Sequence, residues 1–468
     1  MARASWLAGR RALVMGLGTH DGGLGVARYL AHSGAEVTVT DLRGPEALAS
    51  ALEALSGLPL RFTLGEHRAA DFERAEIVVR NPAVPLDSPW LALARAHGAS
   101  IEMEMSLFFR VCPAPIVGIT GTKGKTTTAT LCAGILRQWR PDTVLAGNMG
   151  KSALDTLERI TPETPVVLEL SSWQLEGLVE PGLSPQIAVF TNFSEDHLNR
   201  YRSMAEYLNA KLQIARCQGP DDFFVVNRDD PAIWGARGVT RGHVVPFGVD
   251  DGEASGAFLS GERLLWRRQG EEAEICRAGE LTLPGAHNAR NALAAAAAAL
   301  LRGAAVEDAR RGLTGAAPVP HRQERVAEVD GVLYVNDTAA TTPAAVFAAL
   351  DTFRGRPLVV IAGGSDKQVP LEELARRLAA EAAAVVLLQG AATPELAARL
   401  DAAGTTVLGP FDSMPRAVGT AAGLARPGEI VLLSPGCASF GMFRDEFHRG
   451  EAFREAVGAL SPRGEPVR

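Results

Sequence analysis

Lysine is scarce in this 468-residue chain, because only five of its 47 basic side chains are lysines and arginine supplies the rest. Lysine differs from arginine in offering a compact point charge and an amine that can react. Where arginine is used almost everywhere, a remaining lysine is a candidate for a position that needs one of these properties. Chance is the alternative for one or two of them. The five positions are Lys123, Lys125, Lys151, Lys211 and Lys367.

An excess of positive charge is also missing, since 47 basic side chains face 54 acidic ones. This balance argues against nucleic acid as the main partner. Long hydrophobic runs are absent too: the alanine-rich stretch 292–301 is shorter than the roughly 20 residues of a membrane span. The N-terminal apolar run is broken by Gly16, Gly18 and Asp21 and shows no secretory cleavage pattern. We therefore expect a cytoplasmic protein without a membrane span.

The five cysteines are odd in number, far apart and without CxxC spacing. This pattern predicts reduced, mostly structural thiols and argues against a cysteine-based metal or redox site. What the chain does contain, 47% hydrophobic and 22% charged residues, is typical of a globular protein and excludes a predominantly disordered one. The length favours about three domains.

Alternating strand and helix signals predict an α/β protein with three domains. Residues 11–41 form a strand, a glycine-rich turn, a helix and a strand, which predicts a Rossmann-like N-terminal domain over 1–103. A central parallel sheet like that of phosphate-loop ATPases is expected over 104–318, with a small β insertion at 244–283. A C-terminal Rossmann-like, doubly wound domain is expected over 319–468.

The strongest motif is the run from Gly118 to Thr127, GITGTKGKTT, between an apolar strand and a helical segment. Glycines let backbone N–H groups surround phosphate oxygens, and the following helix adds its positive N-terminus. The spacing matches GxxGK[ST] rather than the strict Walker form, and a purely structural glycine turn is the alternative. The motif predicts nucleotide contacts at Gly121, Thr122, Lys123, Gly124, Lys125, Thr126 and Thr127.

The run from Gly121 to Thr126 resembles the ATP loop of the Mur ligases and of the related folylpolyglutamate synthetases. Segments 168–176, 192–201, 285–292 and 434–439 resemble the glutamate-adding branch of the Mur ligases. The resemblance covers essentially the whole chain in the family's order. It implies an ATP-dependent ligase of peptidoglycan-precursor synthesis. Such an enzyme adds glutamate, with D-glutamate expected, to UDP-N-acetylmuramoyl-L-alanine through an acyl phosphate.

The resemblance also implies a catalytic and metal-binding group. Lys125, Glu169, His197 and Lys211 are the implied catalytic residues. Thr126, Glu169, His197 and a carbamylated Lys211 are the implied ligands of Mg²⁺ at two sites. The alternatives are a helix-capping acid for Glu169, an idle loop residue for His197 and a surface position for Lys211. The remaining implied ATP contacts are Asn288, Asn291, Arg322 and Asp337, with a helix N-cap as the alternative for Asn288.

Two substrate sites are implied in the same way. The glycine-rich turn before Asp41 imitates a dinucleotide site, so NAD binding is an alternative there. This turn is about two residues longer than is usual in the glutamate-adding branch. The implied UDP-substrate contacts are Thr19, Asp41, Arg43, Asn81, Asn148 and Ser171. The implied glutamate contacts are Thr341, Lys367, Ser439, Phe440 and Phe447.

One departure from the family pattern bears on the reaction. Ala339 stands where many relatives carry lysine, so an L-glutamate-adding variant stays open beside the D-glutamate enzyme. Another Mur or folylpolyglutamate-type amide ligase is a second alternative, and a nucleotide-dependent regulatory protein without catalysis is a third. We expect small-molecule substrates, no nucleic acid and a monomer.

Overall fold

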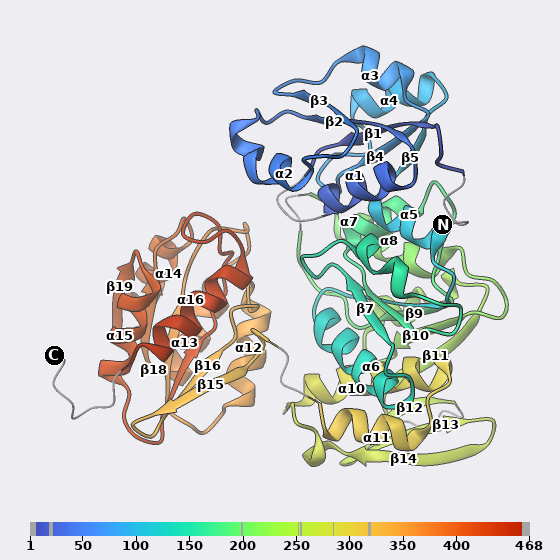
Figure 1. Ribbon diagram of the computed structural model, residues 1–468. Coiled ribbons are helices and arrows are strands. Elements are labelled where there is room, and N and C mark those ends of the chain that lie inside the picture. The colour runs from blue at the N-terminus through green and yellow to red at the C-terminus, as the bar shows by residue number, and fades with distance from the viewer. Residues whose placement is uncertain are drawn as a thin grey trace. The chain divides into compact units, whose positions relative to one another are not determined.

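The structure, a computed structural model, describes residues 6–17, 22–197, 200–250, 252, 255–283, 285–316 and 320–460. Within these residues the chain forms two compact units and three sheets (Figure 1). One unit comprises Met1–Ser194, Ser203–Leu281 and Ala289–Gly315, and the other Glu195–Arg202, Thr282–Asn288 and Ala316–Arg468. The predicted α/β class is confirmed. The domain limits at residues 103 and 318 stay predictions.

The first sheet is parallel throughout, with the strand order β3-β2-β1-β4-β5. Ala12 and Val14 of β1 pack with α1 on one face, and Leu13 and Met15 pack with α3 and α4 on the other. This alternation explains why the apolar run of β1 is continuous, as in a sheet covered on both faces. The elements are β1 (Arg11–Met15), α1 (Gly22–His32), β2 (Glu36–Asp41), α2 (Ala49–Ala54), β3 (Leu60–Leu64), α3 (Ala69–Arg74), β4 (Ile77–Arg80), α4 (Pro89–Ala96) and β5 (Ser100–Glu102).

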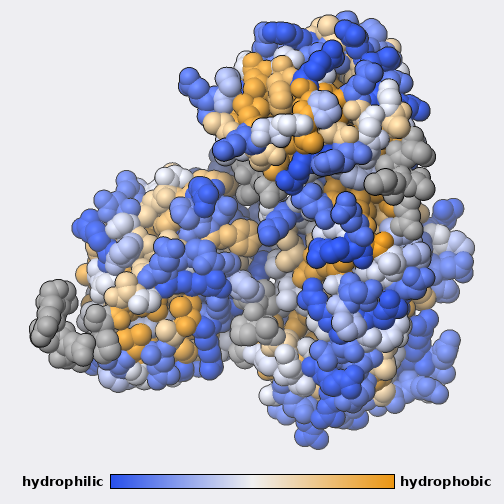
Figure 2. Space-filling model, in the orientation of Figure 1, coloured by the Kyte–Doolittle hydropathy of each residue, from blue (hydrophilic) through white to orange (hydrophobic). Residues whose placement is uncertain are grey.

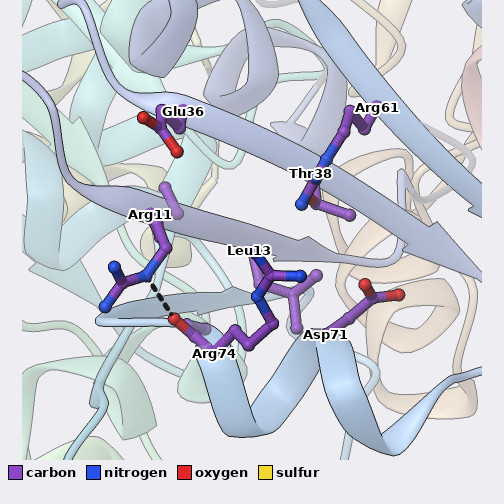
Figure 3. Close-up of a pocket in the computed structure, with 9 residues that line it drawn as sticks. Arg11, Leu13, Glu36, Thr38, Arg61, Asp71 and Arg74 are labelled. Carbon is purple, nitrogen blue, oxygen red and sulfur yellow. Dashed lines mark hydrogen bonds between the residues drawn. The ribbon is translucent and has the colours of Figure 1, made fainter.

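A small pocket opens on this sheet near the amino ends of its strands (Figure 3). Arg11, Arg61 and Arg74 line it together with the acidic Glu36 and Asp71. Arg11 Nε donates to the backbone oxygen of Arg74 at 2.7 Å. Open α/β sheets bind ligands at the opposite, carboxyl ends of their strands. Because the pocket contains none of the predicted site residues, we place the candidate site elsewhere.

The second sheet has the strand order β14-β13-β12-β11-β10-β9-β6-β8-β7, and β6 to β12 pair in parallel. The structure differs here from the predicted β insertion at 244–283. Strand β11 continues the main sheet beside β10, and antiparallel pairing begins only between β12 and β13. The strands are β6 (Ile116–Thr120), β7 (Val144–Gly147), β8 (Val166–Glu169), β9 (Ile187–Phe190), β10 (Phe223–Asn227), β11 (His243–Val249), β12 (Gly256–Ser260), β13 (Arg263–Arg268) and β14 (Glu271–Arg277). The helical segments are α5 (Glu104–Val111), α6 (Lys125–Trp139), η3 (Ala153–Arg159), α7 (Ser172–Leu175), η4 (Glu176–Leu178), α8 (Met204–Arg216), α9 (Pro231–Gly235), α10 (Ala286–Arg302) and α11 (Val306–Thr314).

The alanine-rich stretch forms the body of α10, where the side chains from Ala294 to Ala299 are completely buried. Small residues also bring α11 close to α6, since a Cβ added to Gly312 would lie 2.5 Å from the Cα of Ile135. Across the described residues, no helix is both long and apolar enough to cross a bilayer. The cytoplasmic location and the monomeric state stay predictions.

The third sheet has the strand order β15-β16-β20-β17-β18-β19 and is parallel except for β15. Its two faces carry separate cores, one with α12, α13 and α14 and one with α15 and α16. The elements are β15 (Glu324–Val329), β16 (Val332–Asn336), α12 (Pro343–Thr352), β17 (Leu358–Ala362), α13 (Glu372–Glu381), β18 (Ala382–Leu388), α14 (Thr393–Ala402), β19 (Val407–Phe411), α15 (Met414–Leu424), β20 (Ile430–Leu433) and α16 (Glu446–Gly458).

Arginine supplies the surface ion pairs, as the composition suggests. Figure 2 shows hydrophilic residues over much of the visible face around β13, β14 and α11. Arg263 pairs with Glu274 at 2.5 Å there, and Arg310 pairs with Glu280 at 3.2 Å. Exposed pairs of this kind contribute little to stability, at most about 1 kcal/mol each.

Candidate active site

The glycine-rich loop connects β6 to α6, as predicted. Gly121 and Gly124 have φ of +153° and +78°. A Cβ on Gly121 would lie 1.9 Å from Thr191 Oγ1, and one on Gly124 would lie 2.4 Å from Asn291 Oδ1. Both positions therefore require glycine. Lys125 Nζ donates to the backbone oxygens of Gly121 at 3.1 Å and of the next residue at 3.0 Å, so its ammonium group folds over the loop.

Asn192 fixes the backbone of this loop. Its backbone oxygen accepts from Thr122 N at 2.8 Å, and its side-chain Oδ1 accepts from Lys123 N at 2.8 Å. Its Nδ2 donates to Lys123 O at 2.9 Å. Asn192 was not among the predicted site residues, because Asn192 and Lys123 are 69 residues apart in the chain and no local pattern connects them.

Glu169 ends β8 and is 2% exposed. Its Oε2 accepts from the hydroxyl of Thr126 at 2.7 Å, and its Oε1 accepts from Asn148 Nδ2 at 3.2 Å. A predicted metal ligand therefore contacts both the phosphate loop and a predicted UDP-substrate residue. The helix-capping alternative for Glu169 is wrong, because Ser171 caps α7 by accepting from Gln174 N at 3.2 Å.

Lys211 lies on α8 and is only 1% exposed, so the surface alternative is wrong for this residue. Its Nζ donates to the backbone oxygen of Gly121 at 2.7 Å. The same amine lies 4.8 Å from the ring centroid of Tyr207. The structure thus places the amine directly behind the phosphate loop.

His197 belongs to the segment that packs with the second compact unit. Its φ is +56°, and its side chain is 38% exposed. The ring Nε2 lies 4.0 Å from Asp196 Oδ2. In the part of the chain that the structure describes, no group of three or more His, Cys, Asp or Glu side chains could hold a metal. The metal function of His197 stays a prediction.

Asn288 and Asn291 lie in the first turns of α10, and both are buried. The helix begins at Ala286, so the N-cap alternative for Asn288 is wrong. Asn291 Oδ1 accepts from Thr128 Oγ1 at 3.4 Å and lies against Gly124. Asn291 thus contacts the phosphate loop and the first turn of α6.

The described UDP-substrate candidates of the first sheet, Asp41, Arg43 and Asn81, lie at the carboxyl ends of β2 and β4, the two neighbours of β1. Asp41 Oδ2 accepts from Leu17 N at 3.0 Å and from Arg43 Nη2 at 2.7 Å. Burial opposes ionisation of Asp41, but the hydrogen bonds from Arg43 and Leu17 outweigh it and lower the pKa of the carboxyl group. Asn81 packs against Gly16, whose added Cβ would lie 3.2 Å from Asn81 Cβ. Thr19 lies outside the described residues.

Asp337 follows β16 and is held by two groups. Ser434 Oγ donates to its Oδ2 at 2.9 Å, and Gln323 N donates to its Oδ1 at 3.2 Å. Burial raises the pKa of Asp337 to about 7, although both hydrogen bonds and the nearby charge of Arg322 act to lower it. Arg322 itself lies between His321 and Gln323, which adopt φ of +65° and +45°.

The predicted glutamate residues fall into two groups in the second unit. Lys367 Nζ donates to Thr341 Oγ1 at 3.0 Å. Ser439 is buried, whereas Phe440 and Phe447 are 63% and 45% exposed. The ring of Phe447 packs edge-on against His321, with the centroids 5.7 Å apart. Their glutamate contacts stay predictions.

Arg449 is a buried charge that was not among the predicted site residues. It is 1% exposed and donates to Thr338 Oγ1 at 2.9 Å, to Thr338 O at 2.9 Å and to Cys437 O at 3.1 Å. Burial lowers the pKa of its guanidinium to about 10. Arg449 therefore ties together the loops after β16 and β20, which carry Asp337 and Ser439. The only signal in the sequence is a charged residue on an otherwise apolar helix face.

Comparison with known proteins identifies the family. The Mur ligase MurD-like N-terminal domain matches residues 10–102, the Mur ligase middle domain 119–299 and the Mur ligase glutamate ligase domain 321–437. A curated relative from Roseiflexus sp. is 56% identical over 465 residues, covering 97% of this chain and 100% of its own. This chain belongs to the Mur ligase family. The Roseiflexus relative is named UDP-N-acetylmuramoylalanine--D-glutamate ligase.

Further similarities agree with membership of the Mur ligases. A Symbiobacterium thermophilum protein of the same name is 40% identical, covering 96% of this chain and 98% of its own. Among solved structures, the UDP-N-acetylmuramate-alanine ligase MurC of Thermotoga maritima matches with a TM-score of 0.61 and 22% identity, covering 96% and 99% of the two chains. MurF of Acinetobacter baumannii matches with a TM-score of 0.60 and 17% identity, covering 97% and 92%. These two structures bear on the fold alone. Because Mur ligases are ATP-dependent, membership supports ATP as the nucleotide of the phosphate loop.

Proposed function

We propose that this Mur ligase uses ATP to join the amine of D-glutamate to the alanyl carboxylate of UDP-N-acetylmuramoyl-L-alanine. The observation that carries the proposal is the group of Thr126, Glu169 and Asn148 beside the phosphate loop. It connects the nucleotide loop to a residue implied to contact the UDP-sugar substrate. The names of the Roseiflexus and Symbiobacterium relatives support the same reaction.

The proposed chemistry has two steps. An oxygen of the alanyl carboxylate attacks the γ-phosphorus of ATP, so that a P–O bond forms, ADP leaves and an acyl phosphate results. The free amine of D-glutamate then attacks the acyl carbon. The C–N bond forms, the nitrogen loses a proton and inorganic phosphate leaves with its bonding electrons.

The phosphate loop binds and orients ATP in this scheme. Backbone N–H groups at the N-terminus of α6 attract phosphate oxygens. When ATP binds, the ammonium group of Lys125 exchanges its hydrogen bonds to loop carbonyls for contacts with the phosphates, to which it adds a positive charge. Arg322 and Asp337 are the proposed further ATP contacts, as are Asn288 and Asn291. In the second unit, Lys367 is the proposed partner of a glutamate carboxylate, held by Thr341.

The residues beside the loop fit a divalent cation. The hydroxyl of Thr126 and the carboxylate of Glu169 are oxygen donors in direct contact, which is the ligand chemistry that Mg²⁺ prefers. When bound, Mg²⁺ would offset the negative charge of the phosphoryl group in transfer. Lys211 is the proposed carbamate: its amine would gain CO₂ and lose a proton, and the carbamate would offer a further oxygen ligand. His197 is a further proposed ligand, through a ring nitrogen. The position of Lys211 supports its proposed function, because the buried amine lies directly behind the phosphate loop, with Nζ 2.7 Å from Gly121 O.

Phosphate release by the purified chain tests the proposal. The protein is incubated with ATP, Mg²⁺ and UDP-N-acetylmuramoyl-L-alanine, with D-glutamate, with L-glutamate or without an amino acid. We expect release that depends on D-glutamate, with the product confirmed by its mass. Preference for L-glutamate would instead support the variant suggested by Ala339. Lack of stimulation by either would contradict glutamate addition and favour another amide ligase or a non-catalytic protein.

A further inference from the structure

Arg80 is a buried arginine at the end of β4, directly before the predicted substrate residue Asn81. Its side chain is 1% exposed, which is rare for a charged group. Nη1 donates to the backbone oxygen of Val84 at 2.7 Å, and Nη2 lies 3.7 Å from Glu176 Oε2. Burying this charge is costly unless its partners hold it in one place.

The contact with Val84 closes the turn 81–84. Asn81 N donates to Met15 O at 2.9 Å, and Val84 N donates to Asn81 O at 2.9 Å. Asn81 Oδ1 accepts from Ala83 N at 3.0 Å. Arg80 thus supplies a side-chain bond to the far end of a turn that is otherwise held by its own backbone and by Asn81.

The contact with Glu176 connects Arg80 of the first sheet to the segment that follows β8 of the second sheet. Glu176 begins η4, seven residues after Glu169 in the same continuous segment. This segment packs closely on the connection from the first sheet, because a Cβ added to Gly177 would lie 2.5 Å from Met103 Sδ. A shift of η4 against the first sheet would therefore disturb both the packing of Met103 and the pair with Arg80.

We propose that Arg80 is a positioning residue, which holds the substrate turn 81–84 in a fixed place relative to the segment that begins at Glu169. The inference rests on the proposed function, in which the turn contacts the UDP part of the substrate and Glu169 acts at the phosphoryl transfer. Its effect is to set the distance between the anchored end and the reacting end of one long substrate. Correct orientation of that kind contributes substantially to rate.

The chain offers a matched control in Arg95. Its Nη2 pairs with Glu180 Oε2 at 3.1 Å and also links a helix of the first sheet, α4, to the connection after η4. This pair is exposed, with side-chain exposures of 36% and 51%, and among the described residues the guanidinium of Arg95 forms no hydrogen bond or ion pair with the turn 81–84. Arg95→Met therefore removes an arginine–glutamate link between the same parts without touching the turn.

The experiment compares Arg80→Met, Arg80→Lys and Glu176→Gln with Arg95→Met and the unchanged chain. Calorimetry measures the affinities for UDP-N-acetylmuramoyl-L-alanine and for MgADP, and steady-state assays give KM for each substrate. We expect Arg80→Met to weaken UDP-substrate affinity and raise its KM about ten-fold, the effect of one charge-assisted hydrogen bond. Affinity for MgADP and KM for glutamate should stay within about two-fold. Arg80→Lys should rescue only in part, since one ammonium cannot reproduce the fork that reaches Val84 and Glu176.

Two results would overturn the proposal. One is equal behaviour of Arg80→Met and Arg95→Met toward the UDP substrate. The other is a fall in Tm of the Arg80 variants without a selective change in UDP-substrate affinity, which indicates a structural function alone. If Arg80→Met does not fold, the milder Glu176→Gln decides by the same selective shift. An unchanged chain that binds the UDP substrate but forms no amide bond would contradict the proposed function instead, while the binding comparison would still decide the function of Arg80.

Discussion

Ser434 donates a hydrogen bond of 2.9 Å to Oδ2 of Asp337, across 97 residues of sequence. Burial raises the pKa of Asp337 to about 7, and this hydroxyl is one of the groups that limit the rise. The pair therefore controls the ionisation of a predicted ATP contact close to neutral pH.

Replacing Ser434 by alanine should raise the pKa of Asp337 further. If the carboxylate form contacts ATP, kcat/KM for ATP increases as the pH rises through about 7, and Ser434→Ala moves this increase to higher pH. The pH profiles of the two proteins between about pH 6 and 9 measure the shift. Coincident profiles would show that Asp337 does not titrate during turnover.

Asp337 should also make the folded chain less stable at high pH. Folding raises its pKa, so between about pH 4 and 7 the native state keeps a proton that the unfolded state has already lost. The contribution of Asp337 to the free energy of unfolding is full below this window and falls as the pH rises toward 7. Above about pH 7 it no longer changes with pH. Asp337→Asn removes the effect, so its loss of unfolding free energy from pH 5 to 8 should be smaller than that of the unchanged chain, by up to about 3 kcal/mol. Equal losses in urea unfolding would contradict the buried, protonated state.

Thr126→Val should reduce kcat while leaving the fold intact. Valine has nearly the shape of threonine but cannot donate to Glu169 or offer oxygen to Mg²⁺. We expect kcat to fall at least about ten-fold, the effect of losing one hydrogen bond to a charged group. Thr126→Ser, which keeps the hydroxyl, is the matched control. The interpretation is wrong if serine and valine have the same effect.

Lys211→Arg should abolish turnover but preserve nucleotide binding. Arginine keeps the positive charge beside Gly121 O, yet it cannot form a carbamate. Lys211→Ala should regain part of its activity when short carboxylates are added, since these restore an oxygen ligand. Turnover and MgADP affinity are measured on both variants. Full activity of Lys211→Arg would exclude the carbamate.

Gly124→Ala should destabilise the chain more than a glycine replacement of similar φ elsewhere. Gly124 has φ of +78°, and its added Cβ would lie 2.4 Å from Asn291 Oδ1. Gly98 has φ of +85° with nothing within 4 Å of an added Cβ. Gly98→Ala should cost about 1 kcal/mol for the backbone conformation, and Gly124→Ala about 2–4 kcal/mol because the contact is added. Urea unfolding of the two variants tests the difference, and equal costs would contradict the close contact.

Local patterns predicted much of this molecule because they depend on near neighbours in the chain. The apolar run of β1 and the glycine spacing around Lys125 reflect backbone geometry over a few residues, so the strand, the loop and the following helix were found from sequence. The resemblance to the Mur ligases placed Glu169 and Lys211 near the phosphate loop, and the structure brings both against it. The resemblance alone did not show that Thr126 and Asn148 both donate to the Glu169 carboxylate, which the structure shows.

The amino-acid sequence by itself determined the α/β class, the phosphate loop and the family, because these are written in short motifs and in periodicity. Only the tertiary structure decided which distant groups meet. Ser434 reaches Asp337 because the parallel strands β20 and β16 bring their remote loops to one edge of a sheet. Arg80 of the first sheet reaches Glu176 beside the second sheet, and Arg449 of α16 reaches Thr338 and Cys437 in the loops after β16 and β20. The burial of Lys211 and the raised pKa of Asp337 arise in the same way, since both depend on how much water the folded chain excludes.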